Sequence, residues 1–255
     1  MEMIKKSVVV DNIDIFYLDN ENPNNKTILF SHGWGGDKYN LAAIYNFLKK
    51  EFRVISIDLP GFGESQIDKT IDGTEKYAEV LYKFCKKINL DNIGYVGHSF
   101  GGKIGLILSA NYPDLIEKLI LIDSSGLKPK KSPIWYLKVY AFKALKFLHG
   151  LFTNDPDKIE AFKNKFGSVD YKNSGKLRSI LVKTVNEDLT ALIKKIKIPT
   201  FLYWGAKDKD TPLWMAKKIN RLIPDSGLYV VKNGGHFSFL DDDRIISIIK
   251  SFFGE

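Results

Sequence analysis

A serine flanked by glycines is the first feature of the 255-residue sequence that could perform chemistry. Ser99 lies in the sequence GHSFGG at residues 97–102, after an apolar run over 93–98 and before a helical pattern over 100–111. The pattern G-x-S-x-G between a strand and a helix is typical of a nucleophilic serine on a sharp turn. Such a turn brings backbone segments close together, so side chains at the glycine positions would clash. We therefore expect Ser99 to act as a nucleophile.

The base that Ser99 needs must come from one of four histidines. A serine hydroxyl is a weak nucleophile at neutral pH, and imidazole titrates close enough to neutral pH to activate it. We expect His236 to be this base and to protonate the leaving group later. His98 adjoins Ser99 and should point elsewhere. His32 is expected to hydrogen-bond within its own loop, and His149 to end a helix.

An aspartate is expected to hold the tautomer of His236 and to stabilise its imidazolium form. We favour Asp208 for this role. Asp123 is the alternative acid, because it ends a predicted strand whose end should also face the site. Its other interpretation is a cap or turn residue. Asp210 is close to Asp208 in sequence and is a weaker candidate.

Four further motifs accompany these residues in the chain. They are HGWGG at 32–36, DLPGFGES at 58–65, WGAKD at 204–208 and GGHF at 234–237. Together with GHSFGG, they resemble the motifs of the α/β-hydrolase superfamily, in the order Ser, Asp, His and over nearly the whole chain. The loop at 58–65 is similar to that of the capped, small serine hydrolase and esterase branch. Asp208 and His236 match the acid and histidine motifs of the family.

The resemblance also implies an oxyanion hole. Its donors would be the backbone N–H groups of Phe100, directly after the nucleophile, and of Trp34 in the HGWGG loop. Loss of one such donor typically raises the reaction barrier by about 3 kcal/mol.

The elements that must position these residues alternate between strand and helix. Continuous apolar runs such as Leu119–Ile122 are typical of strands that are covered on both faces. The predicted strands are Ser7–Val10, Ile13–Leu18, Thr27–Ser31, Arg53–Asp58, Ile93–His98, Lys118–Asp123, Thr200–Gly205 and Leu228–Val231. The first two should form an antiparallel hairpin around Asp11-Asn12. We predict an α/β fold of the α/β-hydrolase type, with a mostly parallel eight-stranded sheet flanked by helices.

The segment from 127 to 198 interrupts this alternation. It reads as consecutive helices over Pro133–Leu148, Pro156–Phe166, Ser174–Lys183 and Glu187–Lys195. An insertion between two parallel strands should cover the carboxyl edge of the sheet, where ligands bind in such folds. We therefore predict a core of residues 1–126 and 199–255, with a helical lid at 127–198 inserted after the sixth strand. In the core, Thr74 is expected to cap the helix that follows it.

The net charge of +8 is concentrated in the same segment. Residues 127–198 hold 15 Lys and one Arg against six acids, whereas the rest of the chain is slightly acidic. We do not expect nucleic acid as a partner, because 34 of the 38 basic residues are Lys and no nucleic-acid motif is present. The first lid helix, over 134–148, interleaves lysines with aromatic residues. It is either a helix packed over the site or a contact for an anionic lipid surface or an acidic carrier protein.

Other features define the expected setting. We infer no cofactor and no metal, since no phosphate-loop pattern and no histidine pair with metal spacing occurs. Cys85 is the only cysteine, and no secretory signal or membrane span is visible, so a cytoplasmic protein is expected. The oligomeric state stays open.

These patterns together predict a cofactor-free serine hydrolase that cleaves carboxylic esters with an apolar acyl or alkyl part, through an acyl-enzyme. Because fold and triad do not fix the substrate, a thioesterase, a carbon–carbon hydrolase, a peptidase or a non-catalytic binding protein stays an alternative.

Overall fold

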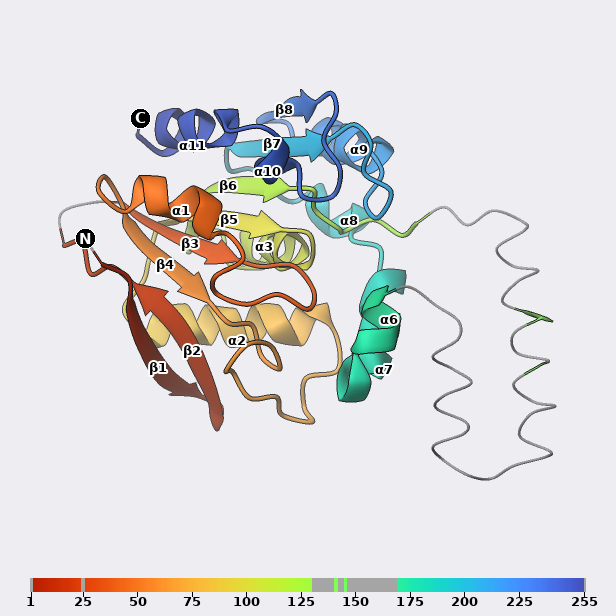
Figure 1. Cartoon of the computed structure of the whole chain (residues 1–255), viewed down its shortest axis with the longest axis horizontal. Helices are drawn as coiled ribbons and strands as arrows, with labels where there is room; N and C mark the ends of the chain where they lie inside the picture. The colour runs from red at the N-terminus through yellow and green to blue at the C-terminus, as the bar shows by residue number, and fades with distance from the viewer. Residues whose placement is uncertain (1, 24–25, 130–139, 142–144, 146–168, 255) are drawn as a thin grey trace.

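Eight strands form one sheet in the computed structural model, which describes residues 2–23, 26–129, 140–141, 145 and 169–254 (Figure 1). The strand order is β1-β2-β4-β3-β5-β6-β7-β8. The strands are β1 Ile4–Val10, β2 Ile13–Asp19, β3 Thr27–Ser31, β4 Arg53–Ile57, β5 Ile93–His98, β6 Ile116–Ile122, β7 Thr200–Gly205 and β8 Ser226–Val231. Strand β2 pairs antiparallel with β1 and β4, and all pairs from β4 to β8 are parallel. The predicted mostly parallel, eight-stranded sheet is confirmed.

The β1–β2 hairpin forms where the sequence predicts it. Its register pairs Val10 with Ile13, which leaves a two-residue turn. The turn residues Asp11 and Asn12 both have positive φ angles, of 48° and 64°. This is the geometry of the two-residue turns that match strand twist, and Asp and Asn tolerate it better than most residues.

Helices cover both faces of the sheet and bury two apolar clusters against it. The helices are α1 Ala42–Leu48, α2 Thr74–Lys87, α3 Phe100–Asn111, α6 Val169–Asn173, α7 Arg178–Asn186, α8 Thr190–Ile193, α9 Trp214–Leu222, α10 Ser238–Asp241 and α11 Arg244–Gly254. One cluster contains residues of α1, α10 and α11, and the other contains residues of α2, α3, α8 and α9. Parallel strands buried on both faces explain the continuous apolar runs in the sequence.

The start of α2 differs from the prediction. The N-cap is Gly73, which has no side chain of its own to cap this helix end. The Thr74 hydroxyl instead donates a 2.5 Å hydrogen bond to the Glu187 carboxylate, and Glu187 is 113 residues away in the chain. The Thr74 hydroxyl, which the local sequence predicts as a helix cap, therefore makes a tertiary contact with Glu187 instead.

Part of the predicted lid region falls within the described residues. Its predicted helices over 133–148 and 156–166 lie outside them. Further on, α6 and a 3-10 turn at Gly175–Leu177 precede α7, and α8 is shorter than the predicted helix over 187–195. These elements follow β6 and precede β7, and α6 and α7 lie beyond the carboxyl ends of the parallel strands (Figure 1). The division into a core and a lid at 127–198 stays a prediction. Among the described residues, no helix has the length and apolar character needed to cross a membrane.

Candidate active site

Ser99 sits at the apex of a strained turn between β5 and α3. Its φ and ψ angles are 49° and −108°, a conformation that costs energy for a residue with a side chain. The glycines on either side permit the turn. A Cβ at Gly97 would lie 2.6 Å from the backbone of Gly101, and a Cβ at Gly101 would lie 2.3 Å from the Ser31 carbonyl oxygen. The steric reason given by the sequence for both glycines is therefore confirmed.

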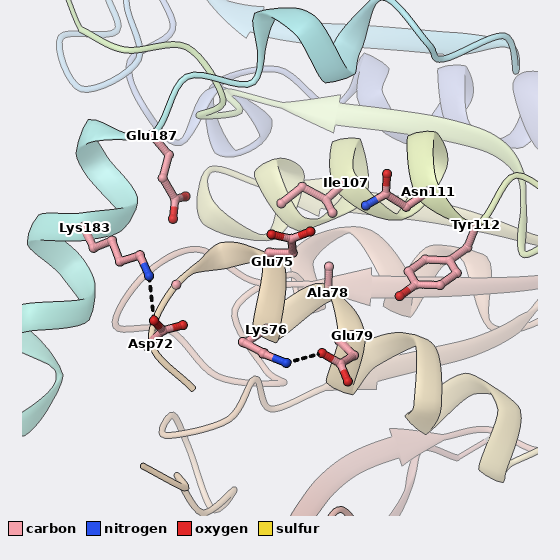
Figure 2. A pocket seen from close by; sticks show the side chains of 11 residues that line it. Asp72, Glu75, Lys76, Ala78, Glu79, Ile107, Asn111, Tyr112, Lys183 and Glu187 are labelled. Carbon is pink, nitrogen blue, oxygen red and sulfur yellow. Dashed lines mark hydrogen bonds and ion pairs between the residues drawn. The ribbon is translucent and has the colours of Figure 1, made fainter. Parts of the chain in front are cut away.

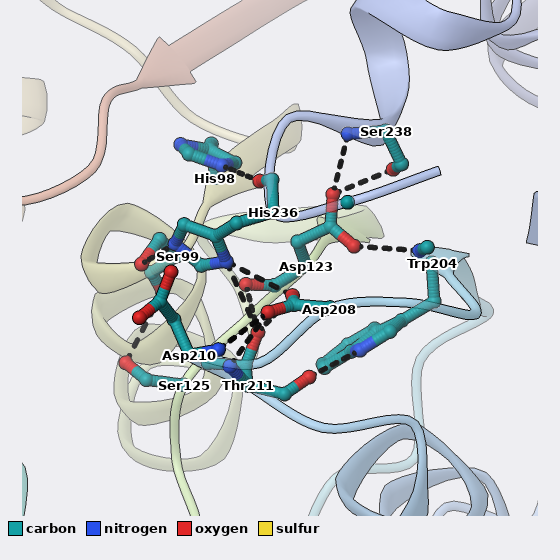
Figure 3. A network of polar contacts seen from close by, with 12 residues as sticks. His98, Ser99, Asp123, Ser125, Trp204, Asp208, Asp210, Thr211, His236 and Ser238 are labelled. Carbon is teal, nitrogen blue, oxygen red and sulfur yellow. Dashed lines mark hydrogen bonds and ion pairs between the residues drawn. The ribbon is translucent and has the colours of Figure 1, made fainter. Parts of the chain in front are cut away.

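Three residues from distant parts of the chain form one line of hydrogen bonds (Figure 3). Ser99 Oγ lies 3.0 Å from His236 Nε2, and His236 Nδ1 lies 2.9 Å from Asp208 Oδ2. An ionised carboxylate only accepts hydrogen bonds, so Nδ1 carries the proton and Nε2 accepts from the serine hydroxyl. This is the arrangement in which an imidazole can remove a proton from an alcohol.

The Asp208 carboxylate is held by donors from the turn after β7. Its Oδ1 accepts hydrogen bonds from the backbone N–H groups of Asp210 and Thr211, at 2.8 and 2.9 Å. The Thr211 hydroxyl donates to Oδ2 at 2.6 Å. Burial alone would raise the pKa of Asp208, but the hydrogen bonds from His236 and Thr211 outweigh burial and lower it. Asp208 is therefore a carboxylate at neutral pH.

Asp123, the alternative acid, lies next to this arrangement but has another role. Its Oδ1 accepts from the Gly205 N–H at 2.8 Å, and its Oδ2 accepts from the N–H and hydroxyl of Ser238 at 3.0 and 2.5 Å. Burial raises its pKa to about 6, against the opposing effect of these hydrogen bonds. The structure thus brings Asp208, and not Asp123, to His236 Nδ1. The Asp123 carboxylate instead links Gly205 at the end of β7 to Ser238 at the start of α10.

His236 combines a buried ring with a nearby negative charge. Burial alone would lower its pKa, but the hydrogen bond and charge of Asp208 outweigh burial and raise it above its ordinary value. Asp210 adds to this effect. The imidazolium form is therefore stabilised where a proton from Ser99 would arrive.

His98 fixes the backbone of the base. Its Nε2–H donates a 2.8 Å hydrogen bond to the carbonyl oxygen of His236. The ring is buried, and burial lowers its pKa to about 3, so it is neutral at physiological pH. His236, and not His98, hydrogen-bonds the Ser99 hydroxyl, whereas His98 joins the end of β5 to the loop that carries His236.

The HGWGG loop after β3 lies against the nucleophile. A Cβ at Gly33 would be 3.2 Å from Ser99 Cβ, and the Gly101 N–H donates to the His32 carbonyl at 3.0 Å. The ring centroids of Trp34 and Phe100 are 5.2 Å apart. Both residues thus lie beside Ser99. Within the described part of the chain, neither of their backbone N–H groups donates to a protein acceptor, so both are available to an oxyanion.

His32 shapes this loop, as the sequence predicts. Its Nδ1–H donates to the Gly33 carbonyl at 2.7 Å, and its Nε2 accepts from the Leu59 N–H at 3.0 Å. Burial lowers the pKa of His32, which fits its neutral tautomer. His149, the remaining histidine, lies outside the described residues.

The segment with α6 and α7 contacts the loops around the nucleophile. The Trp34 indole N–H donates to Ser174 Oγ at 3.1 Å, at the end of α6. A Cβ at Gly61 would lie 3.2 Å from the Leu177 side chain. The segment after β6 therefore reaches two of the motif loops of the site.

Asp208, Asp210 and His236 also have the residue types of a metal site. One ligand atom from each lies within 4.8 Å of the others. However, the Asp208 and His236 atoms already bond to one another, so a metal here would compete with the Ser-His-Asp line. The existing hydrogen bond between Asp208 and His236 therefore favours the Ser-His-Asp line over a metal site at this cluster.

A charged cavity of about 450 Å³ lies apart from the triad, between α2, α3 and α7 (Figure 2). Lys183 and Asp72 form an ion pair of 2.7 Å beside it. Glu187 also lines the cavity, and it pairs with the buried Lys103 at 2.9 Å. None of the three triad residues lines this cavity, and its charges do not suit an apolar acyl chain. We give it no part in the reaction.

Sequence reasoning missed several residues that organise the site. Thr211 orients the acid, His98 fixes the base loop, and Ser238 joins that loop to Asp123. Each of the three lies within three residues of a predicted triad member, which was the available signal that they belong to the site. Nothing local indicates that Ser238 would meet a carboxylate 115 residues away.

Comparisons with known proteins agree with this fold. A family model described as "alpha/beta hydrolase fold" matches residues 26–146. The chain is 25% identical to the uncharacterized hydrolase YugF of Bacillus subtilis, over 93% of both chains. It is 28% identical to Lipase 1 of Psychrobacter immobilis, over 93% of this chain and 80% of that protein. The structure of the enol-lactonase from Burkholderia xenovorans LB400 is similar with a TM-score of 0.75 and 18% identity, covering 98% of this chain and all of that one.

Proposed function

Since this chain belongs to the α/β-hydrolase superfamily, we propose that it is a serine hydrolase that cleaves carboxylic esters through an acyl-enzyme on Ser99. The observation that supports the proposal most is the line of hydrogen bonds from Ser99 through His236 to Asp208, with distances of 3.0 and 2.9 Å. This line joins an alcohol to a base and the base to an orienting carboxylate, which is what nucleophilic catalysis by serine requires.

In the first half of the proposed reaction, Ser99 Oγ attacks the ester carbonyl while its proton moves to His236 Nε2. The carbonyl oxygen becomes an oxyanion that accepts hydrogen bonds from the N–H groups of Trp34 and Phe100. His236 then gives its proton to the departing alkoxide. An alcohol leaves, and the acyl group stays on Ser99.

In the second half, water replaces the serine as the nucleophile. His236 Nε2 takes a proton from water, and the resulting attack on the acyl-enzyme forms a second oxyanion at the same N–H groups. Collapse of this intermediate releases the carboxylic acid and returns the proton to Ser99 Oγ. Asp208 keeps the His236 ring in one tautomer throughout and stabilises its imidazolium form. All atoms of the reaction come from ester, water and these side chains.

The substrate is proposed to have an apolar acyl or alkyl part. Aromatic side chains pack together in the loops next to the nucleophile: the ring centroid of Trp34 lies 5.0 Å from that of Phe62 and 5.2 Å from that of Phe100. The similarity to a lipase supports an ester of this kind. We also propose a reducing, cytoplasmic setting, since the single cysteine, Cys85, is buried, and its burial raises its thiol pKa to about 12.

Replacement of the nucleophile tests the proposal directly. Wild type should react with a fluorophosphonate probe and cleave p-nitrophenyl esters, and Ser99→Ala should lose both properties. Ser125→Ala is the matched control, because Ser125 is also near the turn but its hydroxyl bonds to the Ser99 carbonyl and not to His236. Undiminished turnover by Ser99→Ala would reject the mechanism. A folded wild type that is not labelled would favour a binding protein on this fold.

The acid is tested by comparing two substitutions of the same type. Asp208→Asn should lower kcat by about 10³- to 10⁴-fold, because the asparagine favours the wrong His236 tautomer. Asp123→Asn should lower kcat far less, and its main effect should be on thermal stability. Equal losses of kcat with unchanged stability would contradict the assignment.

The alternative substrates are separated by screening. Acyl esters of graded chain length, with and without terminal carboxylates, are compared with matched thioesters, anilides and a vinylogous 1,5-diketone that hydrolyses at a carbon–carbon bond. The highest kcat/KM is expected for esters. A preference for another bond of at least about tenfold, or 1.4 kcal/mol in the barrier, would move the chain to that reaction class.

A further inference from the structure

The side of the core formed by α8 and α9 carries cations without carboxylate partners. We call Lys194, Lys195, Lys197, Lys217, Lys218 and Arg221 the α8–α9 basic surface; all are exposed except Lys218, which is half-buried. Among the described residues, no carboxylate oxygen lies within ion-pair distance of any of the six. Exposed lysines without an ion pair also occur singly elsewhere among the described residues, as at Lys50, Lys69 and Lys87, so the distinguishing feature of this surface is that six cations gather on two adjacent helices.

The two helices bring these charges together. Both run from the carboxyl edge of the sheet to its amino edge, because α8 ends before β7 begins and α9 connects the end of β7 to the start of β8. Lys218 Nζ donates to the Thr190 hydroxyl at 3.0 Å, which fixes the register between them. Lys194 lies one helical turn beyond Thr190, and Arg221 lies one turn beyond Lys218. The cations of the two helices therefore lie side by side.

This surface includes a shallow, open groove. It has a volume of about 390 Å³ and is lined by Lys217, Asn220, Arg221 and Leu228. Lys217 and Arg221 are four residues apart, so both side chains project from the same face of α9. The groove thus presents two cations and an amide around one apolar side chain.

The chemistry of the surface favours a protein partner. No exposed large apolar side chain of the described residues lies on α8 or α9, so nothing there would insert into a bilayer. Five of the six cations are Lys, and no exposed aromatic ring accompanies them, whereas nucleic-acid binding favours Arg forks and stacking platforms. Lysines around a groove instead match a protein that presents carboxylates.

We propose that the α8–α9 basic surface docks an acidic protein, whose carboxylates, spaced one helical turn apart, reach Lys217 and Arg221 while others meet Lys194 and Lys195. The end of α9 lies toward the amino edge of the sheet, and Ser99, Asp208 and His236 lie at the carboxyl edge. Docking therefore leaves the proposed active site accessible. The surface and its test are independent of the proposed function.

The test measures binding of a labelled, helical peptide of about 20 residues with glutamates at every fourth position, by fluorescence anisotropy in about 50 mM salt, where screening is weak. A peptide with the same composition but scrambled glutamates is the ligand control. The full chain is compared with the variant Lys194→Glu/Lys217→Glu/Arg221→Glu. The matched protein control is Lys50→Glu/Lys69→Glu/Lys87→Glu, which makes the same charge change at dispersed, exposed lysines.

Wild type should bind the regular peptide more tightly than the scrambled one. The surface variant should weaken this binding about tenfold or more, and the dispersed variant less than about threefold. Thermal unfolding verifies that each variant is folded, and Lys217→Gln/Arg221→Gln replaces the triple variant if it is not.

Three results would overturn the proposal: no saturable binding by wild type, equal weakening by both charge-reversed variants, or no discrimination between the peptides. Anionic phosphatidylglycerol vesicles and a duplex DNA are measured in parallel. Tighter binding of either one through the same three residues would show that the partner is a membrane or a nucleic acid and not a protein.

Discussion

Removing Lys103 and removing Glu187, which form an ion pair, should lower the free energy of unfolding by different amounts. Lys103 lies one turn beyond the nucleophile on α3; its side chain is 3% exposed, and that of Glu187 is 23% exposed. Their charged groups are 2.9 Å apart. Lys103 also donates to the Thr184 carbonyl, and Glu187 accepts from the hydroxyl and N–H of Thr74 at 2.5 and 3.3 Å.

These contacts set the expected magnitudes. Glu187→Gln removes the negative charge that pairs with a deeply buried ammonium group and leaves it neutral oxygen acceptors only. An uncompensated buried charge costs about 3–5 kcal/mol. Lys103→Met leaves a carboxylate that is partly exposed and keeps both Thr74 donors, so we expect a loss of about 1–2 kcal/mol. Glu187→Gln should therefore lower the free energy of unfolding by about 2 kcal/mol more than Lys103→Met.

The difference should depend on pH. Burial lowers the pKa of Lys103, and Glu187 opposes only part of this effect. The pKa of Lys103 is therefore lower in the folded chain than in the unfolded chain. At pH values between the two, the unfolded chain binds more protons, so the free energy of unfolding rises with pH. Glu187→Gln removes the opposing charge and widens this window. The deficit of Glu187→Gln relative to wild type should therefore shrink as pH rises from neutrality toward the ordinary pKa of lysine.

Urea unfolding of wild type, both single variants and the double variant checks the reasoning. The double variant should be more stable than Glu187→Gln alone, because it no longer buries an unpaired ammonium group. Lys183→Met is the control, since Lys183 pairs with Asp72 at an exposed site and should cost less than about 1 kcal/mol. Equal losses for the two single variants, or a deficit that does not change with pH, would refute it.

The remaining predictions concern catalysis under the proposed mechanism. Asp210→Asn should move the acid limb of the kcat/KM profile to lower pH: His236 must be neutral to act as a base, and the charge of Asp210 helps to raise its pKa; an unmoved limb would count against this. Gly33→Ala should lower kcat by about tenfold or more, since its Cβ would lie 2.9 Å from His98 Nδ1 and displace the loop of the proposed oxyanion hole; wild-type kcat in steady-state ester cleavage would contradict this. Thr211→Val should lower kcat about tenfold, because the triad carboxylate loses a 2.6 Å hydrogen bond. A wild-type kcat in the same ester assay, together with a lower thermal stability, would disprove this.

Much of the fold was predictable because its signals are local. Apolar runs predicted all eight strands, and three of them have the predicted bounds. The elbow at Ser99 was predictable because glycines at fixed positions are a steric necessity of the turn. Likewise, Asp208 and His236 each lie in a short motif that can be recognised without the fold.

Other features were not predictable because they depend on which distant segments meet. Local sequence makes Thr74 a capping residue, yet its hydroxyl is used by Glu187 from the segment before α8. Asp123 and Asp208 both follow a strand and could equally serve as the acid from sequence alone. The fold decides between them, because Gly205 and Ser238 occupy the Asp123 carboxylate.

Every hydrogen bond that aligns the triad within the described residues comes from outside positions 127–198. The triad and the segment at 127–198 are thus encoded by separate stretches of the gene. Under the proposed mechanism, exchange of that internal stretch for another that keeps Ser174 and Glu187 would alter which molecules enter, while the hydrogen bonds of the triad stayed in place. Recombination between relatives would therefore have a way to produce new selectivity without first sacrificing turnover.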